Sequence, residues 1–158
     1  MSNDASLRDH LVNLLTLGEA HVTFEKAVKN VPVPLRGKTV KGADHTLWEL
    51  LEHLRITQWD ILDFSRNPEY KERPWPSGYW PETAAPPDDK AWDKSVRAFR
   101  RDQKAICDLV KSESTDLFAK IPHGSGQTIL REALLVADHN AYHVGQVVLL
   151  RRLLGDWS

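Results

Sequence analysis

Apolar residues recur with helical spacing in the first half of the chain, in two segments separated by a proline-rich break. The first segment covers about residues 4–30 and ends at VPVPLRGK, because two prolines cannot continue a helix. The second begins near Thr46 and runs to Phe64. Thr46 and Glu49 have the spacing of a capping box, which is typical of a helix start. The pattern predicts a helix over each segment.

The second half of the chain contains two more segments with the same periodicity. The fourth runs from about Thr128 to Leu154, after the connector IPHGSGQT, and ends at Gly155. Four long helices without a convincing strand predict an all-α bundle. The third segment covers residues 88–111, and much of its apolar stripe consists of Trp92, Val96, Phe99, Ile106 and Val110.

A long loop rich in proline and tryptophan, residues 67–89, separates the second and third predicted helices. It holds six of the nine prolines together with Trp75, Tyr79 and Trp80. This proline content rules out a regular helix or a central strand. Loops of this length are uncommon in compact domains and are often functional. The alternative is a connector that its own aromatic side chains hold against the bundle.

Length and composition indicate one domain, residues 1–158, with 41% hydrophobic and 27% charged residues, as in globular proteins. The formal net charge of -1 does not favour a nucleic acid or an acidic membrane surface as a partner. Without a membrane-length apolar run or a secretory signal pattern, we expect a cytoplasmic protein. The single cysteine, Cys107, excludes an internal disulfide and a thiolate metal cluster. Histidines and carboxylates must therefore carry most of any chemistry.

Two histidines, His139 and His143, interrupt the apolar fourth segment within the sequence DHNAYHVGQ. Four residues apart, they lie about 40° apart on one helix face and could offer two nitrogens to one metal ion. His53, a polar residue in the apolar stripe of the second segment, is the best candidate for a third ligand. Buried imidazoles need polar partners, and a shared divalent ion would satisfy all three. The alternative is three core histidines, each bonded to a carboxylate or a carbonyl.

Other polar residues lie on suitable faces to support these histidines. His45, just before the second predicted helix, belongs either to the capping region or to the entrance of the site. His123, in the IPHGSGQT connector, is a candidate accessory group. Four residues could accept hydrogen bonds from ligand histidines, and the sequence does not choose among them: Glu49, Asp60, Glu132 and Gln146.

Small residues recur every fourth position on another face of the fourth segment, at Ala133, Ala137, Ala141 and Gly145. Such a strip allows another helix to approach closely. The neighbour is either a helix of the same bundle or the same helix of a second chain. We therefore expect a homodimer.

Several stretches together resemble the DinB-like superfamily, also called DinB/YfiT-like. They are HTLWELLEHLRITQWDILDF, the YWP of the long loop, Trp92 and IPHGSGQTILREALLVADHNAYHVGQVVLLRRLLG, and DHNAYHVGQ is the most specific. The resemblance extends from the first helix to Trp157. It implies an up-and-down four-helix bundle with a long crossover, often dimeric, and a divalent metal bound by His53, His139 and His143. Related branches include transferases and isomerases that use a low-molecular-weight thiol such as mycothiol or bacillithiol.

Three neutral imidazoles leave a tetrahedral ion one open position, as in catalytic rather than structural zinc sites. Imidazole ligands favour zinc or nickel. A water molecule there would support hydrolysis, with Glu49, Asp60 or His123 as the candidate catalytic base, whereas a small thiol would attack an electrophile as its thiolate. A non-catalytic bundle that binds a metal or a ligand is the third hypothesis. We expect a small-molecule substrate and neither a nucleic-acid nor a membrane partner.

Overall fold

The computed structural model describes residues 2–16 and 20–157. In this part of the chain β pairing is limited to one isolated bridge, between Lys120 and Thr128, so the all-α prediction is confirmed. No helix within it combines the length and the hydropathy that a bilayer crossing requires. The helices are α1 (Asn3–Thr16), α2 (Phe24–Val28), α3 (Leu47–Arg66), α4 (Ala91–Lys111) and α5 (Ile129–Leu153), with 3-10 turns η1 (Val33–Leu35) and η2 (Ser77–Tyr79).

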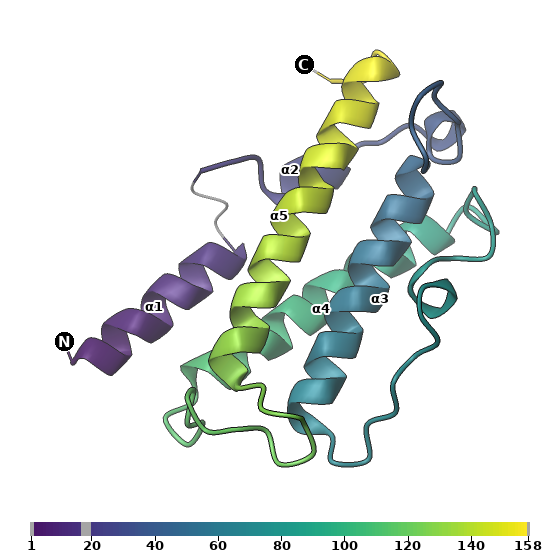
Figure 1. Cartoon of the computed structure of the whole chain (residues 1–158). Helices are drawn as coiled ribbons and strands as arrows, with labels where there is room; N and C mark the ends of the chain where they lie inside the picture. Colours follow the sequence, from purple (N-terminus) through teal and green to yellow (C-terminus); the bar gives the residue numbers. More distant parts are fainter. Residues whose placement is uncertain (1, 17–19, 158) are drawn as a thin grey trace.

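The four long helices α1, α3, α4 and α5 form a bundle in which α3 and α1 each pack against α4 and α5 (Figure 1). Helices α3 and α4 run in the same direction. Gln58 donates a hydrogen bond to the carbonyl of Phe99, and further along both helices Ile61 and Ile106 line one small cavity. Helices α1 and α5 run the opposite way. The helical bundle is therefore confirmed, and its helices follow an up, down, down, up order.

The parallel course of α3 and α4 depends on the long loop, which occupies residues 67–90 and returns along the bundle (Figure 1). The later part of this loop is attached to the residues before α3. Thr46 Oγ1 donates to the carbonyl of Ala84 at 2.7 Å. A Cβ added to Gly37 would lie 2.3 Å from the Cβ of Ala85, so this close approach requires glycine at position 37.

The prediction of one continuous helix over about residues 4–30 is wrong, because α1 and α2 are separate. Residues 17–19 of that prediction lie outside the described part of the chain. Thr23 has extended backbone angles, φ -71° and ψ 156°, and its side chain accepts a hydrogen bond from the backbone N–H of Lys26. Thr23 therefore begins a new helix as its N-cap. The apolar spacing continues past this position, so the pattern does not reveal the break.

Two apolar clusters form the core, one in each half of α3. Between them lies the fully buried side chain of Gln58, which donates to the carbonyl of Phe99 at 2.8 Å and accepts from Asn140 Nδ2 at 2.9 Å. The capping box of Thr46 and Glu49 is confirmed at the start of α3. The predicted stripe on α4 is buried along its whole length, at Trp92, Val96, Phe99, Ile106 and Val110.

Candidate metal centre

Three histidine side chains from two helices converge inside the bundle. Helix α3 contributes His53, and α5 contributes His139 and His143, which are one turn apart. One nitrogen from each ring lies within 4.8 Å of the others, and the Nε2 atoms of His53 and His139 are 3.0 Å apart. The structure therefore brings together the three residues that the sequence singles out.

A backbone carbonyl of the long loop orients His53. The Nδ1 atom of His53 lies 2.8 Å from the carbonyl oxygen of Tyr79 and is its hydrogen-bond donor, since a carbonyl can only accept. The proton of the neutral ring is thereby placed on Nδ1. The lone pair of Nε2 then faces the other two histidines, which is the tautomer that a metal ligand needs.

The next residue of the loop, Trp80, fixes the plane of the His53 ring. The two rings are stacked 3.9 Å apart with an angle of 4° between their planes. The indole also stacks on His45, at 3.8 Å and 18°. His45 therefore lies beside the histidine cluster, as one of the two interpretations of the sequence expects.

Gln146 orients the third histidine. Its side-chain oxygen lies 2.6 Å from Nδ1 of His143, which leaves the Nε2 lone pair of His143 free. Of the four polar residues considered as hydrogen-bond acceptors for the histidines, Gln146 is the one in this position. Glu132 instead pairs with Arg131, at 2.8 Å.

The surroundings of His139 fit a bound cation. Nδ1 of His53 donates its proton to Tyr79. The Nε2 atoms of His53 and His139, which lie 3.0 Å apart, therefore have only one proton to share. In addition, Nδ1 of His139 is buried and has no hydrogen-bond partner among the described residues, and the same is true of Oδ1 of the neighbouring Asn140. A cation between the Nε2 atoms would take both lone pairs and move the His139 proton to Nδ1, beside that orphaned oxygen. The donor set and its environment thus fit a divalent ion.

Burial keeps the three imidazoles neutral. Burial, with a smaller contribution from the neighbouring imidazoles, lowers the pKa of His53 to about 4 and that of His139 to about 3. The pKa of His143 is lowered by the same burial. The carbonyl of Tyr79 opposes the shift at His53 but does not cancel it. At neutral pH all three rings therefore carry the free lone pair that metal binding requires.

The three residues proposed as a catalytic base have other partners. Glu49 accepts a hydrogen bond from the backbone N–H of Thr46, at 2.7 Å, in the capping box. His123 is exposed, and its Nε2 lies 2.7 Å from the carbonyl oxygen of Phe64. Asp60 is buried and holds the long loop. Their proposed role as a base stays a prediction.

Asp60 binds the part of the loop that covers the site, residues 67–80, which we call the strap. Its carboxylate accepts hydrogen bonds from the hydroxyls of Tyr79, at 2.9 Å, and Tyr70, at 3.2 Å. Arg73 lies within ion-pair distance, at 3.8 Å, and also donates to the carbonyl of Gly78. Burial raises the pKa of Asp60 and of both tyrosines, and the carboxylate raises the tyrosine values further. Asp60 therefore anchors the segment whose carbonyl orients His53.

The roles of Tyr79 and Trp80 were not predicted from the sequence. The available signal was the aromatic YWP of the long loop, which indicated packing or function without naming a contact. Tyr79 acts on His53 through its backbone oxygen, a group that every residue type has.

Comparison with known proteins assigns the chain to a family. A family model described as the DinB superfamily matches residues 9–147, which is most of the chain. Comparisons with curated proteins and with solved structures gave no match. The fold, the three converging histidines and the family match agree. The chain belongs to the DinB superfamily.

Proposed function

We propose that this protein binds one divalent metal ion through His53, His139 and His143 and uses it in catalysis. The observation that supports this most strongly is the tautomer of the ligands. Tyr79 and Gln146 occupy Nδ1 of His53 and His143, which leaves Nε2 of each ring for an ion, and one nitrogen of each of the three rings lies within 4.8 Å of the others. Histidines that served only to pack the core would not need this arrangement.

Zinc or nickel suits three imidazole ligands best. A divalent ion with three neutral ligands supplies an open position and a positive charge, which lowers the pKa of a thiol or water molecule bound there. The chain supplies the dry, aromatic surroundings. Trp80 covers one face of His53 and excludes water from that side.

Among the possible activities we propose a transferase that uses a low-molecular-weight thiol. A hydrolase needs a base beside its water molecule, and the three candidate bases bond elsewhere, Glu49 with Thr46, Asp60 with the strap and His123 with a carbonyl. The ion lowers the pKa of either nucleophile, but ester or amide hydrolysis also needs a group that passes a proton to the leaving oxygen or nitrogen, whereas a thiolate can attack an electrophile without one. These contacts support the transferase over the hydrolase.

The first test measures bound metal after purification, by mass spectrometry, in the wild type and in His53→Ala and His143→Ala. We expect metal in the wild type and its loss in both variants, because two imidazoles hold a divalent ion far more weakly than three. His10→Ala, a substitution of an exposed histidine on α1, is the control and should keep the metal. Full retention of metal in both test variants would contradict the three-histidine site.

Thermal unfolding of the same variants separates a functional ion from a structural one. Loss of metal with little change in Tm would support a functional site, and a collapse of Tm would favour an ion that steadies the bundle.

The holoprotein is then assayed with mycothiol, bacillithiol or glutathione together with electrophiles, and separately with esters and amides. Thiol-dependent turnover that His53→Ala abolishes is the expected result. Turnover only of esters or amides would favour the metal-dependent hydrolase. Inactivity in both assays would favour a non-catalytic binding protein.

A further inference from the structure

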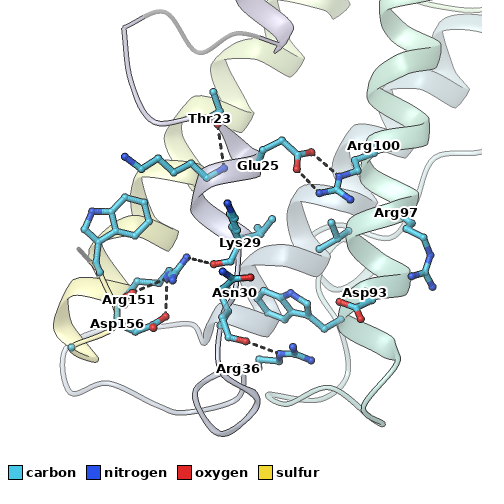
Figure 2. A pocket seen from close by; sticks show the side chains of 17 residues that line it. Thr23, Glu25, Lys29, Asn30, Arg36, Asp93, Arg97, Arg100, Arg151 and Asp156 are labelled. Carbon is cyan, nitrogen blue, oxygen red and sulfur yellow. Dashed lines mark hydrogen bonds and ion pairs between the residues drawn. The ribbon is translucent and has the colours of Figure 1, made fainter.

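A second candidate site lies away from the histidines, in a groove of about 1360 Å³ (Figure 2). Its walls are α2 and the residues that follow it, the first half of α4, and the turn after α5. The buried side chain of Trp92 and the neighbouring valines of α2 and α4 form its floor. His53, His139 and His143 do not line this groove.

The groove is positively charged although the chain as a whole has a formal net charge of -1. Positive charge is therefore gathered on this surface and offset elsewhere. The lining carboxylates are Glu25, Asp93 and Asp156, and the lining cations are Lys26, Lys29, Arg36, Arg97, Arg100 and Arg151.

Two of the cations are neutralised within the chain. Arg100 pairs with Glu25, since Nε and Nη2 of the arginine each donate to one carboxylate oxygen. Arg151, only 7% exposed, pairs with Asp156 at 2.9 Å and donates to the carbonyl of Ala27 at 2.8 Å. These contacts tie α2 to α4 and to the end of α5, so they hold the walls of the groove in place. They also use two of the three carboxylates.

Lys29 and Arg97 remain exposed, and neither has a salt bridge with a described residue. They come from opposite walls, Lys29 from the residue after α2 and Arg97 from α4 (Figure 2). Lys26 lies over the indole of Trp157, at 5.8 Å, and adds charge at one end. An anionic ligand in the groove would therefore meet positive charge without a salt bridge from two of its walls.

We propose that this groove binds a small organic phosphate with two or more phosphate groups. Arginine presents a planar fork of N–H donors that matches phosphate oxygens, and lysine adds a compact positive charge. Lys29 and Arg97 contact the phosphates from two different elements, which the pairs Arg100–Glu25 and Arg151–Asp156 hold in place. The site is separate from the metal centre and does not depend on it.

The test is calorimetric titration with pyrophosphate and with ATP, in phosphate-free buffer of low ionic strength. Lys29→Gln and Arg97→Gln should each weaken pyrophosphate binding about tenfold, the factor for one lost charge-assisted hydrogen bond of about 1.4 kcal/mol. Lys120→Gln and Arg66→Gln are matched controls, since both residues are exposed and lie outside the groove. The controls should bind as the wild type does, and matching circular dichroism spectra should show that all four variants fold.

Phosphates also bind metal ions, so the titration is repeated in His53→Ala. Retained affinity there, with a shift of the Trp157 indole N–H signal in the NMR spectrum of the wild type, supports the groove. Binding lost in His53→Ala would assign the phosphates to the metal centre and overturn the proposal. Absence of saturable binding, equal affinity in test and control variants, or equally tight binding of citrate would also overturn it.

Discussion

At the scale of single residues, one hydrogen bond determines which nitrogen each of two histidines offers. The Nδ1 atoms of His53 and His143 are held by a carbonyl and by an amide oxygen, so in both rings the lone pair available to an ion is on Nε2. Asp60 belongs to the same arrangement, because it anchors Tyr79 and Tyr79 holds His53. Its contacts favour a positioning role over the role of a catalytic base.

Two tyrosines that bind the same carboxylate allow this role to be tested. Tyr79→Phe removes the hydroxyl that bonds to Asp60 and so loosens the residue whose carbonyl orients His53. We expect the affinity for zinc to fall about tenfold, at the lower end of the range for residues that orient metal ligands. Tyr70→Phe removes the other hydroxyl on Asp60 but leaves Tyr79 in place. The measurement is competition for zinc with a chromophoric chelator.

Tyr70→Phe should keep an affinity close to that of the wild type. Equal losses in the two variants would mean that the strap matters only as a whole. An unchanged affinity in Tyr79→Phe would refute the link between Asp60 and His53.

At the scale of elements, α5 combines ligand, core and surface faces in one helix. The side of α5 that carries Ala133 and Ala137 is buried in the core, so the first half of the small-residue strip packs within the chain. The helix ends at Leu153, and Gly155, with a φ of +75°, follows just past its end, where a residue without a side chain is favoured. In the first turn, Glu132 is a buried carboxylate.

The buried carboxylate of Glu132 makes the stability depend on pH. Burial raises the pKa of Glu132 above the ordinary glutamate value of 4.5, and Arg131 opposes the shift without cancelling it. Folding therefore favours the protonated form. The stabilisation of the fold by protonated Glu132 is fully present below pH 4.5 and is lost as the pH rises through the folded-state pKa.

We expect Glu132→Gln to be more stable than the wild type at pH 7.5, because the variant buries no charge there. Its advantage should shrink as the pH falls toward 4.5. Urea unfolding across this range measures the difference, and Glu113→Gln, which changes an exposed carboxylate, is the control. An advantage independent of pH would show that ionisation of Glu132 is not its cause.

At the scale of the whole molecule, the outer face of α5 has no covering element within the described residues. Tyr142, Leu149 and Leu153 are 65%, 56% and 59% exposed, and a Cβ added to Gly145 would meet nothing within 4 Å. Gly145, at the end of the small-residue strip, thus stays open, whereas Ala141 is half-buried. We propose that this face of α5 forms the interface of a homodimer.

If α5 forms that interface, Leu149→Glu should convert a dimer into a monomer, because it places two charges in an apolar contact. Light scattering after size-exclusion chromatography measures the mass. Leu14→Glu, at a residue of α1 that is 52% exposed, is the control and should leave the dimer intact. A monomeric wild type at high concentration would exclude the proposal.

The sequence by itself determined the elements and the ligand candidates. Periodic apolar residues and a capping box are local signals, and they predicted four helical segments. The structure has a helix in each of them, but the first segment is divided into α1 and α2, with Thr23 as the N-cap of the second. Polar residues in apolar stripes singled out His53, His139 and His143, because burial without a partner is costly.

The tertiary structure alone decided what surrounds those histidines. Which carbonyl meets His53 has no signature in residue type, because every residue carries the same backbone oxygen, and Tyr79 is 26 positions away. The parallel course of α3 and α4 and the cationic groove likewise depend on contacts between distant segments. Local patterns specify which residues must be buried or paired, and only the packed chain specifies the groups that they pair with.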